Sequence, residues 1–481
     1  MDELDRWIAA SHGRFTAELR ELCAIPSEGG DDAALDTAAR WCRDRLAAAG
    51  CADAREIRAD GAPALVVGET GGPAGAQAPV VGETGGPAGA QGPLSRGNGG
   101  ECPRMRTLIG VQHYDVQPAV PLALWASPPY AAEVRDGALY ARGADDNKGH
   151  LLLRIQAVEA HRAVFGELPI RLRFLIEGEE ESASPNLARL LAQEPALLDA
   201  DGALKEGGGI DPAGRPQLFL GGKGIFYVEL RVRSMARDAH SGGATHLPNA
   251  AWRLVEALGT ILDRRGRVQI DGFYDDVRPP SAEERARVAA LRYDAAELRR
   301  LYEIDRFAFG RGDDEVRFAS VFEPTANICG IWSGYTGKGT KTVIPSEAAA
   351  KIDFRLVPDQ DPERIRQLLR AHLDRHGFAD IELDAREGTR PYRGAIDDPL
   401  VRATKAVAEE AFGAEASLVP SSGGTSPMWV VCHRHALANV TLGMGHPGAG
   451  AHAPNEHILF ANYWRALRAT ARLYSAYATQ E

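Results

Sequence analysis

Cysteine is scarce in this sequence, and its pattern excludes two common kinds of site. The chain has 481 residues and six cysteines, which lie far apart with no C-x-x-C pair. Disulfide frameworks and thiolate zinc sites normally show as closely or regularly spaced cysteines. We therefore expect reduced and mostly buried thiols at all six positions: Cys23, Cys42, Cys51, Cys102, Cys329 and Cys432.

Clusters of basic residues are also missing. The formal net charge is −11, and the 55 lysines and arginines are spread along the chain rather than gathered in one tract. Surfaces that bind nucleic acid or anionic membranes usually present clustered positive charge. The charge pattern therefore argues against nucleic acid and membrane partners and favours a small or neutral molecule.

The sequence contains no run of eighteen apolar residues, the minimum expected of a membrane-spanning helix. The first residues, MDELDRWIAASHGRF, are acidic and follow a helical pattern. A secretory signal would instead begin with basic residues followed by an apolar run. We therefore predict a cytoplasmic protein.

One short repeat interrupts the first part of the chain. The stretch VVGETGGPAGAQ occurs at residues 66–77 and again, identically, at 80–91. A solenoid needs three or more repeats with apolar faces that stack. Because these copies are rich in Gly and Pro and have almost no apolar residues after the Val pair, we interpret residues 66–100 as a flexible surface loop.

The length of the chain exceeds one ordinary hydrophobic core, so two domains are expected. Strand patterns near 107–111 and 169–176 alternate with a helical pattern at 149–166, which is typical of an α/β fold with a largely parallel sheet. Strands near 224–234, 326–335 and 348–358, with helices near 248–263 and 281–303, indicate a separate α+β unit. We predict a catalytic domain formed by residues 1–222 and 395–481, whose mostly parallel sheet is flanked by helices, and an α+β domain inserted at 223–394.

Acidic residues and histidines occur where several predicted strands end. They lie in the segments QHYDVQP, ARGADDNKG, IEGEEES and GAGAHAPNE. Each segment alone has an ordinary explanation: a core histidine, a helix-capping aspartate or a solvated acidic loop. Because the carboxyl ends of parallel strands meet at one edge of a sheet, their joint occurrence indicates a shared site. Histidine and carboxylate ligands without cysteine suit Zn²⁺, Mn²⁺ or Co²⁺.

Two of these segments indicate how such a site could work. His113 and Asp115 point to the same side of an extended chain, so Asp115 can accept the second ring N–H of His113 while the histidine binds a metal. Glu180 and Glu181 follow the apolar strand LRFLI directly. On an irregular turn, one of these glutamates can bind a metal while the other takes a proton from a metal-bound water.

The same segments resemble, in order and over nearly the whole chain, those of the dinuclear-zinc exopeptidase and deacylase family. This family includes carnosinase-type dipeptidases, carboxypeptidase G, aminoacylase, acetylornithine deacetylase and succinyl-diaminopimelate desuccinylase. The resemblance implies two divalent ions, with zinc as the first choice and manganese or cobalt as alternatives, and a metal-bridging water. It implies five metal ligands: His113, Asp146, Glu181, Glu206 and His452.

Some of these assignments are more specific than others. By the resemblance, Asp146 bridges the two ions and the Asp146–Asn147 peptide bond is cis. Glu180 is the general base, and Asp115, which orients His113, completes the catalytic pair. For the fifth ligand Glu206 fits best, while Asp199 and Asp201 remain alternatives because that region departs from the pattern of the family.

The inserted domain resembles the family's dimerisation or lid domain. His240, in RDAHSGG, resembles a histidine that reaches into the site of the neighbouring subunit of a homodimer and binds the scissile carbonyl oxygen. Arg355 resembles the arginine that binds the substrate carboxylate, and Gly424 and Thr425 fall in the substrate-binding loop. We predict a metallopeptidase that hydrolyses dipeptides or short peptides. An N-acyl amino acid deacylase with the same site is the main alternative, and a non-catalytic relative is a more distant one.

Overall fold

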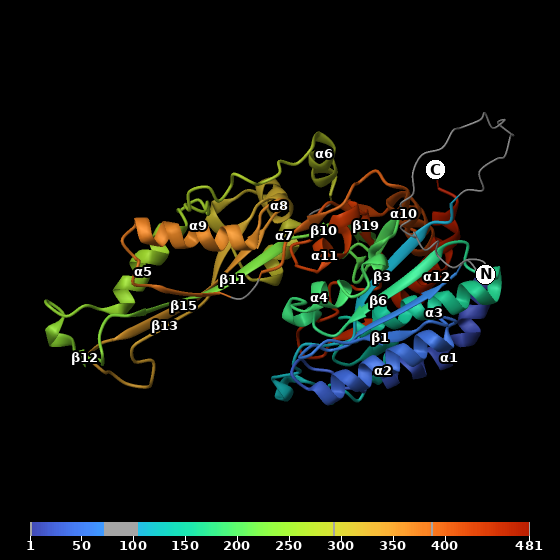
Figure 1. Cartoon of the computed structure of the whole chain (residues 1–481), viewed down its shortest axis with the longest axis horizontal. Coiled ribbons are helices and arrows are strands. Elements are labelled where there is room, and N and C mark those ends of the chain that lie inside the picture. The colour runs from blue at the N-terminus through green and yellow to red at the C-terminus, as the bar shows by residue number, and fades with distance from the viewer. Residues whose placement is uncertain (1, 72–103, 292–293, 386–387, 481) are drawn as a thin grey trace, which may run out of the picture.

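A computed structural model describes residues 2–71, 104–291, 294–385 and 388–480. These residues form two lobes of different size (Figure 1). The larger lobe contains both ends of the chain, and the smaller lobe extends away from it as an elongated unit of strands and helices.

The larger lobe is built on a six-stranded sheet with the strand order β1-β2-β6-β3-β7-β19. The last four of these strands are parallel, while β1 and β2 add an antiparallel edge. All seven residues of β3, TLIGVQH, are buried, as expected for a central parallel strand covered on both faces. The predicted α/β class is confirmed. The strands are β1 (Arg55–Ile57), β2 (Leu65–Thr70), β3 (Thr107–His113), β6 (Arg171–Glu177), β7 (Gly202–Lys205) and β19 (Asn439–Thr441).

Helices cover both faces of this sheet. One face carries five helices that share a single hydrophobic core: α1 (Glu3–Cys23), α2 (Asp32–Ala48), α3 (Lys148–Phe165), α10 (Pro399–Phe412) and α12 (Phe460–Ala478). The other face packs against the shorter helices α4 (Leu187–Leu191) and α11 (Met428–Cys432). Because α10 and α12 come from the end of the chain, the C-terminal segment returns to the lobe in which the chain began (Figure 1).

The interpretation of residues 66–100 as a surface loop is wrong for its first five residues. Residues 66–70 belong to β2, which pairs with β1 on one side and β6 on the other. Val66 and Val67 are fully buried. The β-branched residues of VVGET favour a strand, a preference that the Gly- and Pro-rich composition of the whole stretch obscures. Residues 72–103, which include the second copy, lie outside the described residues.

The smaller lobe contains a four-stranded antiparallel sheet with the order β13-β15-β11-β16. Its strands are β11 (Gly224–Arg233), β13 (Thr325–Ser333), β15 (Glu347–Leu356) and β16 (Glu382–Ala385). Helices α5 (Ala250–Ile261) and α9 (Pro362–Arg375) share the hydrophobic core of this lobe with β11 and β15. The lobe therefore has the expected α+β character.

The helical pattern near 281–303 forms two helices, α6 (Ala282–Ala290) and α7 (Ala295–Leu301). Each has its own N-cap, because Ser281 accepts the backbone N–H of Glu284 and Asp294 accepts that of Glu297. A further helix, α8 (Asp313–Phe322), follows before β13. Val288 of α6 and Phe322 of α8 are buried in one apolar cluster with Val419 of the larger lobe, so this segment ties the two lobes together.

The remaining strands are short. They are β4 (Glu133–Arg135), β5 (Ala138–Tyr140), β8 (Gly209–Ile210), β9 (Pro216–Phe219), β10 (Gly221–Gly222), β12 (Ala239–His240), β14 (Val343–Ile344), β17 (Tyr392–Arg393), β18 (Ser417–Val419) and β20 (His457–Leu459). The five described cysteines are free thiols, and all except Cys329 are buried. Within the described ranges, every helix is too short or too polar to cross a bilayer.

Candidate active site

A cleft of about 500 Å³ lies between the two lobes. Its lining includes Glu181 and Glu206, from the carboxyl ends of β6 and β7, and Arg355 from β15 of the smaller lobe. The apolar sequences of β3, β6 and β7 bury the strands, so the polar residues that follow them meet at this edge of the sheet. The predicted clustering of acids and histidines at strand ends therefore occurs here.

His113 is the last residue of β3 and is only 1% exposed. Its Nδ1 lies 3.0 Å from the backbone oxygen of Asp115 and 3.3 Å from the carboxylate oxygen Oδ1 of the same residue. Its Nε2 lies 3.2 Å from Asp146 Oδ1. Asp115 thus occupies one ring nitrogen and leaves the other facing the carboxylate of Asp146, which is the arrangement expected of a metal-binding histidine and the residue that orients it.

The Asp115 carboxylate also holds the turn that carries the two glutamates. Its oxygens accept the backbone N–H groups of Glu180, at 3.2 Å, and of Glu181, at 3.0 Å. One buried carboxylate therefore fixes both the histidine and the glutamate pair.

Asp146 lies on the turn before α3, and the peptide bond from Asp146 to Asn147 is cis, as expected. The fully buried Glu456 organises this turn. Its carboxylate accepts the backbone N–H groups of Gly143, Asp145 and Asp146 at 2.8–3.0 Å and pairs with Arg142 at 2.6 Å. Glu456 was not assigned a role from the sequence, although it closes the segment GAHAPNE that contains His452.

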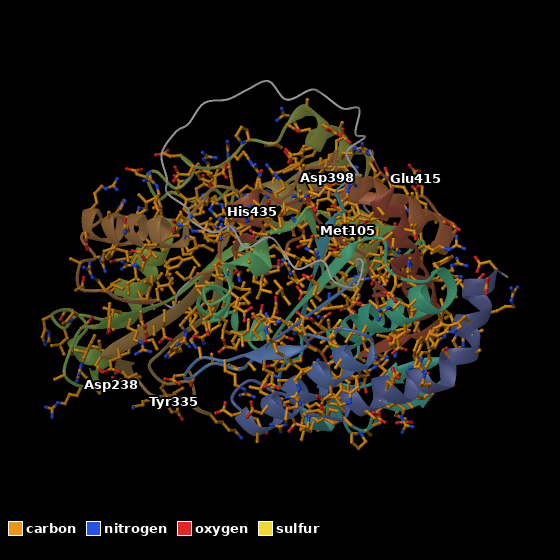
Figure 2. The ribbon with its side chains drawn as sticks, turned by 45° about the vertical axis from the view of Figure 1, so that its right-hand side comes forward. Met105, Asp238, Tyr335, Asp398, Glu415 and His435 are labelled. Carbon is orange, nitrogen blue, oxygen red and sulfur yellow. The ribbon has the colours of Figure 1, made fainter. Side chains whose placement is uncertain are left out.

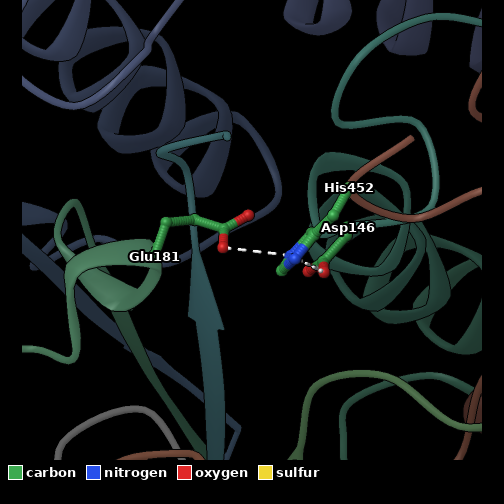
Figure 3. Close-up of side chains that lie close together, drawn as sticks. All are labelled: Asp146, Glu181 and His452. Carbon is green, nitrogen blue, oxygen red and sulfur yellow. Dashed lines mark ion pairs between the residues drawn. The ribbon is translucent and has the colours of Figure 1, made fainter. Parts of the chain in front are cut away.

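Three of the expected ligands come together directly. The Nε2 atom of His452 lies 3.0 Å from Asp146 Oδ2 and 3.1 Å from Glu181 Oε2, and Figure 3 shows the imidazole between the two carboxylates. One ligand atom from each of these residues falls within 4.8 Å of the other two. Gln117 was not expected from the sequence; its Nε2 donates to Glu181 Oε2 at 3.0 Å and orients that carboxylate.

The position of Glu206 separates it from its two alternatives. Glu206 follows the carboxyl end of β7, and its Oε2 lies 3.9 Å from His113 Nε2. Asp201 precedes the same strand and accepts the backbone N–H of Thr107 at the start of β3. Asp199 pairs with His435 outside the cleft. Of the three carboxylates, only that of Glu206 lies at the end of the strand that faces His113 and Asp146.

The residues present fit a divalent metal centre. Oε1 of Glu181 and Oε2 of Glu206 are buried without a hydrogen-bond partner among the described residues. A buried oxygen without a partner destabilises the folded protein unless a cation or a water molecule binds it. Hydrogen bonds with Asp146 and Glu181 raise the pKa of His452 to about 10. Burial opposes ionisation of Asp146, but its hydrogen bonds with His113 and His452 outweigh burial and lower its pKa. The cluster therefore attracts positive charge.

Glu180 differs from Glu181 in its surroundings. Its carboxylate lines the cleft, yet it makes no hydrogen bond or ion pair with any other described residue. Burial and the neighbouring carboxylate of Glu206 raise its pKa well above the ordinary value. Glu180 is thus placed beside the group formed by Asp146, Glu181 and His452 without belonging to it.

Arg355 and the loop at 424–425 face each other across the cleft. Nη1 of Arg355 donates to Thr425 Oγ1 at 2.8 Å, and Nε lies 3.2 Å from Asp353 Oδ2. Gly424 and Thr425 line the same cleft. A guanidinium held from two sides in this way keeps N–H groups available for a carboxylate.

His240 does not lie in the cleft of its own chain. It is an exposed residue of β12, at the outer end of the smaller lobe (Figure 1), and its Nδ1 accepts the backbone N–H of Gly242 at 3.0 Å. Figure 2 shows the nearby Asp238 at the same outer end, together with Tyr335. The contact with Gly242, rather than any residue of the cleft, therefore orients the imidazole ring of His240.

Comparisons with known proteins agree with the motifs and the fold. The model of peptidase family M20/M25/M40 matches residues 111–479. The Beta-Ala-His dipeptidase of Homo sapiens is 31% identical over 397 residues, which cover 79% of this chain and 75% of that protein. The Cys-Gly metallodipeptidase DUG1 of Saccharomyces cerevisiae is 27% identical over 401 residues, which cover 79% of this chain and 81% of that protein.

A solved structure extends this agreement to the whole chain. The M20 family metallo-carboxypeptidase Sso-CP2 from Sulfolobus solfataricus matches with a TM-score of 0.84 and 32% sequence identity, covering 99% of this chain and 100% of that one. The resemblance inferred from the sequence segments is confirmed.

Proposed function

We propose, because this chain belongs to peptidase family M20/M25/M40, that it is a metal-dependent hydrolase that cleaves dipeptides. The names of the two relatives, a Beta-Ala-His dipeptidase and a Cys-Gly metallodipeptidase, support dipeptides as the substrate class. The observation that carries the proposal is the placement of Glu180, the group of Asp146, Glu181 and His452, and Arg355 around one cleft. The N-acyl amino acid deacylase stays an alternative, without support from these names.

In this proposal five residues hold two divalent ions, zinc first and manganese or cobalt as alternatives: His113, Asp146, Glu181, Glu206 and His452. Asp146 has contacts to both histidines, with Oδ1 near His113 and Oδ2 near His452, which supports a bridging role. When bound, such ions supply an activated water and polarise a carbonyl group.

The side chains around the ions have separate tasks. Glu180 takes the proton of the attacking water and returns it to the amine that leaves. Asp115 keeps Glu180 in place through the backbone N–H of that residue. Arg355, held by Thr425 and Asp353, binds the terminal carboxylate of the substrate and aligns the peptide bond with Glu180.

A turnover screen tests this function. Protein loaded with Zn²⁺, Mn²⁺ or Co²⁺ is incubated with matched pairs such as Ala-Gly and N-acetyl-glycine, and released amino acid is measured. We expect metal-dependent hydrolysis of the dipeptides and at least tenfold slower hydrolysis of the acylated amino acids. The reverse preference would support the deacylase instead.

The ligand set predicts the metal content of variants. Wild-type protein is expected to bind two divalent ions per chain, and Glu206→Gln about one, because the substitution removes the charge of a carboxylate whose Oε2 is buried without a hydrogen-bond partner among the described residues. Asp201→Asn is the matched control and should keep both ions, since Asp201 lies at the opposite end of β7. Elemental analysis after dialysis measures the ratio. Loss of an ion from Asp201→Asn, with two retained in Glu206→Gln, would reverse the assignment.

We also propose that the protein is a homodimer that pairs through the smaller lobe. β13 is an edge strand of its sheet, and Ile328, Ile331 and Trp332 on it are 50%, 52% and 43% exposed. The neighbouring α5 exposes Trp252 at 68%. Long edge strands with exposed apolar residues are normally covered by another chain, which supports a second copy at this edge. Location in the cytoplasm stays a prediction from the sequence.

A further inference from the structure

Lys205 is a second cation in the cleft, and neither the sequence motifs nor the proposed mechanism uses it. It is the last residue of β7 and lines the cleft together with Arg355. The residue is only 8% exposed. Lysine is rarely buried to this extent unless its ammonium has a partner.

The structure provides only a distant partner for the ammonium of Lys205. Among the described residues, the only charged contact of Lys205 Nζ is Glu206 Oε1, at 3.9 Å, which is too long for a hydrogen bond. The proposed function assigns the Glu206 carboxylate to a metal ion. The three N–H groups of the ammonium are then left for another acceptor in the cleft.

The direction of β7 indicates where that acceptor lies. Side chains alternate along a strand, so Lys205 leaves the sheet on the same face as Ala203. Ala203 packs in one cluster with Met428 and Val431 of α11. Lys205 therefore extends toward the side of the sheet covered by α11, and α11 begins just after Thr425, the residue that contacts Arg355.

We propose that Lys205 binds a second carboxylate on the substrate residue that Arg355 holds, so that the preferred dipeptides end in Asp or Glu. This inference rests on the proposed function, because Arg355 there receives the terminal carboxylate. Two cations that line the same cleft match a residue with two carboxylates, whereas a neutral side chain would leave the Lys205 ammonium without a charged acceptor. The cost of such an unpaired group disfavours the neutral substrate.

The test compares substrates that differ only in this carboxylate. With metal-loaded wild-type protein, kcat/KM is expected to be about tenfold or more higher for Ala-Glu than for Ala-Gln, and likewise for Ala-Asp over Ala-Asn, since a charge-assisted hydrogen bond contributes at least that much. Lys205→Met should abolish the preference mainly by raising KM for the acidic substrates. It should leave Ala-Gln turnover within a few-fold and the metal content at two ions per chain.

Two variants sharpen the comparison. Lys205→Arg should keep part of the preference because it keeps the charge, and Lys341→Met, which removes an exposed lysine, should change nothing. Calorimetric binding of the products glutamate and glutamine gives the same comparison without turnover: tighter binding of glutamate, lost in Lys205→Met, is expected.

Two results would overturn the proposal. Equal kcat/KM for Ala-Glu and Ala-Gln, with equal binding of the two products, would show that no second carboxylate is recognised. If Lys205→Met lowers kcat/KM equally for both substrates and also loses an ion, Lys205 supports the position of Glu206 and does not bind the substrate. Absence of any metal-dependent peptide hydrolysis is a different result, since it contradicts the proposed function while the product-binding comparison still decides this inference.

Discussion

Replacing Glu180 with Gln is expected to lower kcat by roughly 10²–10⁴-fold, the usual contribution of a positioned general base. The amide has the shape of the carboxylate but cannot take a proton from water. The backbone N–H of residue 180 would still donate to Asp115, so the turn should remain in place. Because no hydrogen bond or ion pair joins the Glu180 carboxylate to the expected ligands, the variant should retain two ions per chain and a nearly unchanged KM.

A matched control exists on the preceding residue. Glu179 accepts two hydrogen bonds from Asn186 at 3.0 Å and is not among the residues that line the cleft, so Glu179→Gln should keep full activity. The informative contrast is with Glu181→Gln, which we expect to lose metal because Glu181 contacts His452. If Glu180→Gln loses an ion and Glu181→Gln keeps both, the two glutamates have exchanged roles.

The fold could be predicted from the sequence where periodicity is strong. The buried strands β3 and β6 and the long helix α3 alternate as the apolar pattern indicates. β2 was missed because five strand residues, VVGET, are followed by a Gly- and Pro-rich run, and the composition of the whole stretch outweighs them. The break between α6 and α7 was missed because it depends on single capping residues rather than on periodicity.

The sequence could predict those parts of the site whose segments lie at the ends of predicted strands. Sequence spacing alone could not choose among Asp199, Asp201 and Glu206, because the choice depends on which end of β7 each occupies, and the strand is only four residues long. Contacts such as those of Glu456 with the Asp146 turn join residues more than 300 positions apart, which no local pattern reveals. The direction of Lys205 follows from the alternation of side chains once β7 is placed, so it needed the strand boundaries first.

The position of His240 leads to a test of the quaternary arrangement. His240 lies at the outer end of the smaller lobe, away from the cleft of its own chain (Figure 1). If it serves the site of a partner, each subunit of a two-fold dimer completes the other. A His240→Ala chain and a Glu180→Gln chain should then each form nearly inactive dimers, since every site in them lacks one residue. His246→Ala, which removes a nearby exposed histidine of the same lobe, should stay active.

Mixing the two inactive chains is expected to restore activity to about one quarter of wild type. Random exchange places one chain of each kind in half of the dimers, and such a dimer has one site with Glu180 from its own chain and His240 from the partner. Since half of the dimers are mixed and each mixed dimer has one working site out of two, one quarter of all sites are complete. If His240 acted within its own chain, the mixed dimer would contain no complete site, and activity would stay at the level of the single variants. Native mass spectrometry should first confirm that exchange has occurred, and activity that remains at that level after confirmed exchange would exclude the role of His240 in the partner's site.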